Sequence, residues 1–174
     1  MLLHVDGARL CNAAASLNLN LKEITADVGV DVLSFGGTKN GMMFGEAVIF
    51  FDKNLSKNFE YFRKQGMQLN SKMRYISIQF ETLLSDNLWL KNAKYSNNMA
   101  KLLLSKIENI PEIKITQKVE TNAIFAKIPR KTIEILKKSY FFYTIDEQSS
   151  EVRWMCSFNT KKEEANQFVI YSIQ

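Results

Sequence analysis

The apolar and polar positions of the first 51 residues follow the pattern of short buried strands around one helix. Apolar runs at 1–5, 31–35 and 46–51 are bounded by Asp or Gly, which is typical of strands buried in a sheet. The alanine-rich stretch 7–17 predicts a helix, and 21–26 predicts a further helical turn. This part of the chain therefore has the β-α-β order of a parallel pair, followed by a loop and another buried strand.

The middle of the chain, from residue 54 to about residue 109, has helical periodicity. Apolar residues recur three to four positions apart in 54–66, 72–84 and 88–107. Gly66 ends the first of these helices and Pro111 ends the last. The helix over 88–107 is long enough to connect two structural units.

The remainder of the chain predicts a small α/β unit. Strands are expected at 113–115, 122–128, 141–145 and 151–156, and helices at 131–138 and 161–170. We place the domain boundary near Ser85, which gives one domain over 1–85 and a linker helix with a small domain over 86–174.

Composition narrows the possible functions. The chain has 174 residues, 46% hydrophobic and 24% charged, which fits one globular domain or one domain with a small appendage at roughly 150 residues per domain. The net charge of +5 permits nucleic-acid binding, but the lysines are scattered, so no nucleic-acid partner is expected. Two distant cysteines and one histidine exclude a disulfide framework and a histidine-based zinc site, and no metal site is expected. With neither a signal-peptide pattern nor an apolar stretch of roughly 18 residues, we expect a cytoplasmic protein without a membrane partner.

Charged side chains follow the first two predicted strands. Asp6 and Arg9 come after the first strand, and Thr38 and Lys39 come after the second. Because parallel strands end at one edge of the sheet, these side chains are expected to converge there. A lysine amine forms a Schiff base with an aldehyde, and pyridoxal phosphate needs a carboxylate on its ring nitrogen. Asp6 can supply that carboxylate, Arg9 can donate to the phenolic oxygen or a substrate carboxylate, and Thr38 can contact the phosphate.

Simpler interpretations stay open on spacing alone. Asp6 could cap a helix that begins near Gly7, and Lys39 could be a solvated side chain of a glycine-rich loop. In the segment 151–158, Val152 and Trp154 alternate with Arg153 and Met155, which places Arg153 on the opposite face of a strand. That pattern by itself favours an ordinary exposed arginine.

Two motifs resemble one enzyme family closely. HVDGARL at 4–10 and SFGGTKNG at 34–41 resemble the low-specificity L-threonine aldolases, which are pyridoxal-phosphate enzymes of fold type I in the β-eliminating lyase group. The resemblance continues through 62–65, 71–75, 88–93 and 152–158. It implies an α/β fold: the C-terminal part of a large cofactor-binding domain with a mostly parallel sheet, plus a small α/β domain.

The resemblance also implies roles for particular residues. The lysine matching Lys39 binds the cofactor covalently, and the aspartate matching Asp6 pairs with the pyridine nitrogen. The arginine matching Arg9 lies beside cofactor and substrate, and the one matching Arg153 helps to hold the substrate carboxylate by two-point hydrogen bonding. The implied reaction cleaves L-threonine or L-allo-threonine to glycine and acetaldehyde in a homodimer or homotetramer.

Members of that family are nearly twice as long, and this chain resembles only their second half. The expected active site is therefore incomplete. The chain could be a fragment, could pair with a separately encoded N-terminal half, or could be a non-catalytic remnant that acts in assembly. Other fold-type-I chemistry, such as β-elimination or transamination, also stays open, because a fold does not fix a reaction.

Overall fold

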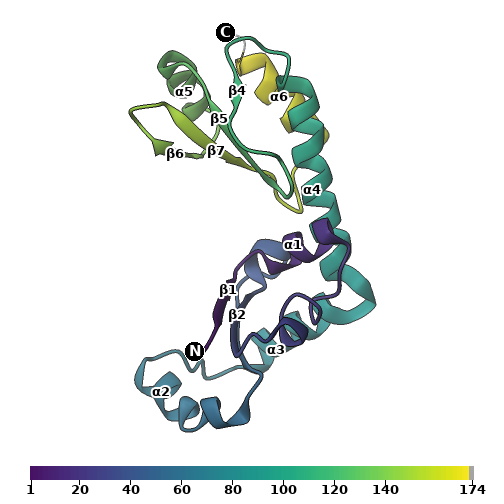
Figure 1. Cartoon of the computed structure of the whole chain (residues 1–174), viewed down its shortest axis with the longest axis vertical. Helices are drawn as coiled ribbons and strands as arrows, with labels where there is room; N and C mark the ends of the chain where they lie inside the picture. The colour runs from purple at the N-terminus through teal and green to yellow at the C-terminus, as the bar shows by residue number, and fades with distance from the viewer. Residues whose placement is uncertain (173–174) are drawn as a thin grey trace. The chain divides into compact units, whose positions relative to one another are not determined.

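The structure, a computed structural model, describes residues 1–172 and divides into two compact units (Figure 1). Unit 1 comprises residues 1–92 and unit 2 begins at Ala93. The division falls inside helix α4 (Leu88–Ile107), whose first turn belongs to unit 1, whereas the sequence placed the boundary before this helix, near Ser85. No helix within residues 1–172 has both the length and the apolar character needed to cross a bilayer.

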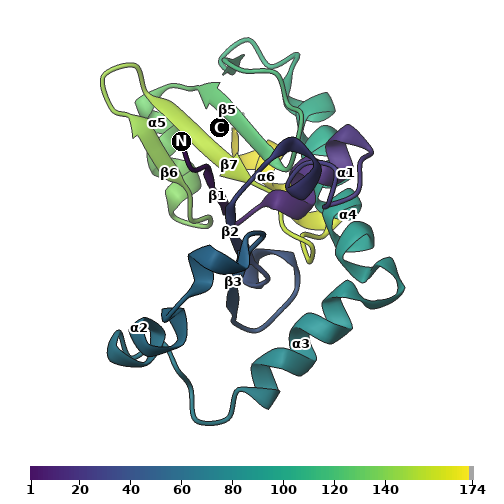
Figure 2. The same ribbon diagram turned by 60° about the horizontal axis from the view of Figure 1, so that its bottom comes forward.

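Unit 1 contains a three-stranded sheet in the order β1-β2-β3, whose strands are all labelled in Figure 2. The strands are β1 (His4–Gly7), β2 (Val32–Gly36) and β3 (Glu46–Phe50). Strands β1 and β2 are parallel, with Asp6 opposite Ser34, and β3 is antiparallel to β2. The β-α-β order expected from the sequence is confirmed.

Strand β3 differs from the expected buried strand. Its side chains Glu46, Val48 and Ile49 are exposed, and within the described residues it pairs only with β2. An apolar run is buried only where another layer covers it, and unit 1 covers β3 incompletely, although Phe50 packs against the Phe59 ring at 4.9 Å. The prediction of a buried strand is therefore wrong for this unit.

Helix α1 (Leu10–Leu17) connects the two parallel strands and starts later than the sequence predicted. It buries Leu10, Cys11 and Ala14 against the unit. The helix ends at Asn18, which adopts a left-handed conformation with φ 55°. A short polar side chain tolerates that conformation better than most residues do, which explains the stop.

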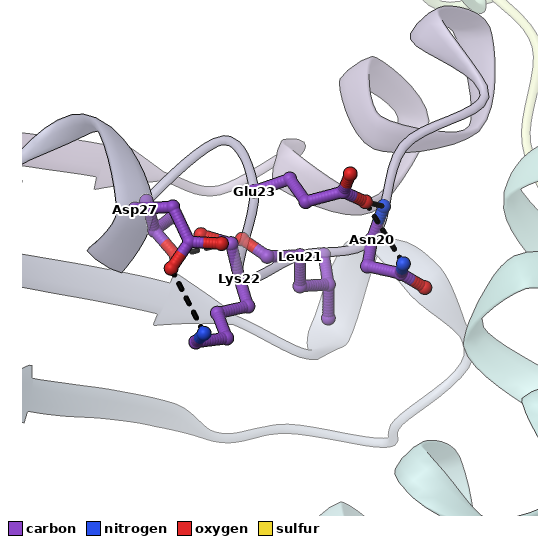
Figure 3. Close-up of polar contacts among 6 residues, drawn as sticks. Asn20, Leu21, Lys22, Glu23 and Asp27 are labelled. Atoms are coloured by element: carbon purple, nitrogen blue, oxygen red, sulfur yellow. Dashed lines mark hydrogen bonds and ion pairs between the residues drawn. The ribbon is translucent and has the colours of Figure 1, made fainter.

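The connection from α1 to β2 is a polar turn instead of the predicted helical turn over 21–26 (Figure 3). Both the backbone N–H and Nδ2 of Asn20 donate to Glu23 Oε2, at 2.6 and 2.8 Å. Lys22 pairs with Asp27 at 2.9 Å, and a short 3₁₀ helix, η1, follows at Ala26–Val28. These local bonds satisfy the backbone without a helix and lead the chain into β2.

Helices dominate the rest of unit 1. The predicted helix over 54–66 is split into η3 (Lys53–Ser56) and α2 (Phe59–Gln65) by Asn58, whose φ of 64° no helix accommodates. Helix α3 (Arg74–Leu84) and the 3₁₀ turn η4 (Ser85–Asn87) precede α4. The observed bounds of α4 are those that the sequence predicted.

Unit 2 is an antiparallel sheet with helices against it (Figure 2). The strand order is β4-β5-β7-β6, and the core includes Ile124, Leu136 and Val152. The bounds are β4 (Lys114–Ile115), β5 (Ala123–Lys127), α5 (Arg130–Lys137), β6 (Tyr143–Asp146), β7 (Glu151–Met155) and α6 (Lys162–Ser172). The small α/β unit expected from the sequence is present.

Candidate active site

The parallel pair β1–β2 brings two of the predicted site residues to one edge of the sheet. Asp6 lies opposite Ser34, next to the carboxyl end of β1. Lys39 lies in the loop that leaves the carboxyl end of β2. Because the strands are parallel, their carboxyl ends share an edge, and this edge is where open α/β sheets bind ligands.

Asp6 organises the turn that follows β1. Its side chain is exposed, and Oδ1 accepts a hydrogen bond from the Ala8 backbone N–H at 3.1 Å. Helix α1 begins only at Leu10, and Arg9 occupies the position before it. The alternative role of Asp6 as the helix cap is therefore wrong, because the chain completes a turn before the helix begins.

His4 contributes to the same polar edge. Its Nε2 lies 2.9 Å from Ser34 Oγ, and the ring is exposed. His4 and Asp6 point to the same face of β1, since side chains alternate along a strand. The exposure of the ring shows that His4 is not a packed core histidine within the described residues.

The loop that carries Lys39, residues 37–45 and here called the lysine loop, is closed by hydrogen bonds between its two ends. Thr38–Asn40 forms a 3₁₀ turn, η2. Gly37 N–H donates to Gly45 O at 3.2 Å, and Gly45 N–H donates to Thr38 Oγ1, also at 3.2 Å. The exposed Lys39 side chain has no hydrogen bond or ion pair within residues 1–172. The Lys39 amine is thus an exposed, unpartnered group on a loop closed by its own hydrogen bonds.

A second layer of contacts ties this loop to the first turn of α4. Asn40 is buried, and its Nδ2 donates to Trp89 O at 3.0 Å. In return, Asn92 Nδ2 donates to Asn40 O at 2.8 Å. Gly41 has φ +122°, and a side chain there would come within 2.7 Å of Asn92 Nδ2. Sequence reasoning missed these residues, because no local pattern links positions 52 residues apart.

The thiol of Cys11 also packs beneath this loop. Burial raises its pKa to about 11, although a hydrogen bond with the Asn40 side chain opposes that rise. A thiol with so high a pKa is protonated at neutral pH and is a poor nucleophile. Cys11 is therefore a buried neutral thiol beside the Asn40 side chain of the loop.

Arg9 is half-buried where α1 begins. Its backbone O accepts hydrogen bonds from the N–H groups of Asn12 and Ala13, at 3.0 and 3.3 Å. The first turn of the helix thereby fixes the position of the Arg9 backbone, immediately after the turn that Asp6 closes.

Arg153 belongs to unit 2, on strand β7. The predicted alternation is confirmed: Val152 and Trp154 are buried in the core, and Arg153 lies half-buried on the other face. Its Nε is buried without a hydrogen-bond partner. Its guanidinium carbon lies 5.5 Å from the centre of the Tyr143 ring. A buried donor left unpaired is costly, and no protein group within residues 1–172 compensates for it here.

Comparison with known proteins agrees with this arrangement. Residues 1–130 match the beta-eliminating lyase family. A low-specificity L-threonine aldolase of Pseudomonas sp. (strain NCIMB 10558) is 44% identical over 161 residues, which cover 92% of this chain and 46% of that protein. The structure of Leishmania major threonine aldolase superposes with a TM-score of 0.87 at 31% identity, over 98% of this chain and 50% of that one.

More distant structures share the fold alone. Ornithine aminotransferase from Toxoplasma gondii, described with partial occupancy of PLP at its active site, matches with a TM-score of 0.59 at 13% identity. That match covers 99% of this chain and 42% of the aminotransferase. The expected α/β fold of fold-type-I enzymes is confirmed, and the chain spans about half the length of the curated relatives it matches. With its first 130 residues matching the family, this chain belongs to the beta-eliminating lyases.

Proposed function

We propose that this chain supplies part of the active site of a pyridoxal-phosphate-dependent threonine aldolase. The reaction would cleave L-threonine or L-allo-threonine to glycine and acetaldehyde. One observation carries the proposal: the parallel β1–β2 pair ends in a carboxylate on one strand and a lysine loop on the other, in a chain 44% identical to such an aldolase.

The residues at this edge fit the chemistry of that cofactor. Lys39 offers an unpaired amine for the aldehyde carbon, and Asp6 offers an exposed carboxylate for the ring nitrogen. Arg9 and the Thr38 hydroxyl are the candidate donors to the phenolic oxygen and the phosphate. When bound, pyridoxal phosphate supplies an electron-poor ring that accepts the electron pair of the breaking Cα–Cβ bond.

The protein's own side chains would act by holding the cofactor and orienting the substrate. The Asp6 carboxylate would keep a proton on the ring nitrogen of the bound cofactor, because a nearby negative charge favours the protonated form of its partner. The planar guanidinium of Arg153 would bind the substrate carboxylate by two parallel hydrogen bonds. That grip fixes rotation about the N–Cα bond and thereby selects which bond to Cα breaks.

Assembly completes the proposal. Because the chain spans about half of its relatives, the remaining site residues would come from the other half of the aldolase fold. Assembly into homodimers or homotetramers and a cytoplasmic location stay predictions.

The test uses the full chain, alone and coexpressed with the complementary half of the Pseudomonas relative. After incubation with pyridoxal phosphate and borohydride reduction, mass spectrometry should find the adduct on Lys39. The coexpressed pair should release glycine and acetaldehyde from threonine in equal amounts. Lys39→Ala should abolish both the adduct and the release of glycine and acetaldehyde. Lys53 is an exposed lysine of the same unit, and Lys53→Ala should leave both readouts intact.

Two results would contradict this proposal. An adduct that survives Lys39→Ala would remove Lys39 from its role. Release of ammonia or a keto acid in place of glycine would show that the assembled site breaks a different bond.

A further inference from the structure

Arg153 is held on the outer face of the unit 2 sheet in an unusual way. The buried side chains of β7, Val152 and Trp154, face the helices, so Arg153 faces away from the core. Its Nε is inaccessible and has no hydrogen-bond partner within residues 1–172. No hydrogen bond at Nε restrains this guanidinium, which leaves its other neighbours to orient it.

The acidic residues of the sheet do not supply that restraint. Glu151 shares the face of Arg153, two positions earlier on β7, but its Oε1 accepts a hydrogen bond from Thr116 Oγ1 at 2.5 Å. The ion pairs found within residues 1–172 join Lys22 to Asp27 and Lys118 to Glu120, and neither includes Arg153.

The neighbouring strand supplies an aromatic ring. Tyr143 on β6 lies directly opposite Arg153 in the strand register, and the guanidinium carbon is 5.5 Å from the ring centre. Tyr143 is itself braced by Phe141, whose ring lies 5.2 Å away at 78°. On the other side of Arg153, Phe125 occupies the matching position of β5. The arginine thus lies between two aromatic residues, and one of them contacts its charge.

We propose that Tyr143 is a positioning residue that holds the Arg153 guanidinium ready for a substrate carboxylate. A ring attracts the cation without accepting its hydrogen bonds in the ordinary way, so the terminal N–H groups of the guanidinium stay available for a ligand. A carboxylate partner in the protein would have occupied those donors. This inference rests on the proposed role of Arg153 in binding the substrate carboxylate.

The first measurement is independent of catalysis. In the full chain, the ring current of Tyr143 should displace the NMR signals of the Arg153 side chain from their ordinary positions. Tyr143→Leu should return these signals toward ordinary values, and Tyr143→Phe should retain most of the displacement. Identical signals in the wild-type chain and Tyr143→Leu would overturn the proposed contact.

The second measurement uses the chain assembled with its complementary half. Tyr143→Leu should raise KM for threonine roughly threefold to tenfold, the range expected for losing one cation–π contact. Tyr143→Phe should recover most of the lost affinity. Ile145→Ala, an exposed apolar residue of the same strand without a ring, is the matched control and should leave KM unchanged.

A double-mutant comparison separates this inference from the proposed function. If Tyr143 acts through Arg153, adding Tyr143→Leu to Arg153→Ala should raise KM no further. Additive effects would overturn the positioning role. If Arg153→Ala alone leaves KM unchanged, the assignment of Arg153 to the substrate fails, while the NMR comparison still decides whether Tyr143 orients it.

Discussion

Burial governs the two thiols of this chain. Cys11 in unit 1 and Cys156 in unit 2 are both almost inaccessible, with 2% and 5% of their surface exposed. Desolvation raises the pKa of each from 9.0 to about 11, because a thiolate loses its hydration inside the protein. Both cysteines therefore behave as small apolar core residues.

This shift predicts a loss of stability at alkaline pH. The unfolded chain releases each thiol proton near pH 9, whereas the folded chain retains it until about pH 11. The unfolded state then binds fewer protons, so the free energy of unfolding falls as pH rises through this interval. Urea unfolding of the wild type should show a steeper fall than Cys11→Ala and Cys156→Ala show. Equal pH dependence of the free energy of unfolding in the wild type and the two variants would contradict this prediction.

Single residues also show what local patterns predict. The face of Arg153 was predictable, because strand alternation depends only on the sequence of β7. Spacing alone left open whether Asp6 caps a helix, because Ala8 and Arg9 are compatible with either a helix or a turn. Only the turn closed by Asp6 Oδ1 decides between them.

At the scale of elements, helix α4 was predicted with its observed bounds and strand β3 was misjudged. Helix α4 has a long apolar period and a proline beyond its end, and both signals are local. The apolar run of β3 does not itself indicate whether another layer covers the strand. Its exposure depends on neighbours that a sequence pattern does not specify.

The tie between the lysine loop and α4 can be tested by one substitution. Asn92→Ala removes the donor to Asn40 O and should lower the free energy of unfolding by about 1–2 kcal/mol, because a half-buried carbonyl loses its partner. Asn98→Ala, an exposed asparagine of the same helix, should change it by less than about 0.5 kcal/mol. Urea denaturation measures both variants. A similar loss in the free energy of unfolding for Asn92→Ala and Asn98→Ala would show that the hydrogen bond does not stabilise the loop.

At the scale of the whole molecule, the two units differ in how well they bury their apolar residues. The large hydrophobic cluster, which includes Ile107, Ile124 and Trp154, lies entirely within unit 2. Most exposed large apolar residues among those described lie in unit 1, among them Met43, Phe62 and Met67. A groove of about 900 Å³ beside β3 is lined by several of these side chains. Such surface usually marks contact with another polypeptide.

We therefore expect the two units to behave differently when separated. Residues 93–174 should fold alone, with a cooperative thermal transition by circular dichroism, because their core is complete. Residues 1–92 should bind a hydrophobic dye and aggregate. Cooperative, dye-free folding of 1–92 would contradict the view that this unit needs a covering partner.

The crossed amides of Asn40 and Asn92 have a consequence for how relatives of this chain vary. Each amide donates to a backbone carbonyl, Asn40 to that of Trp89 and Asn92 to that of Asn40, so each hydrogen bond keeps its acceptor when the other side chain changes. Across homologues the two positions should therefore vary independently of each other, although both bonds join the same loop to the same helix. Gly41 should stay invariant regardless, since its φ of +122° restricts it independently of what stands at position 92.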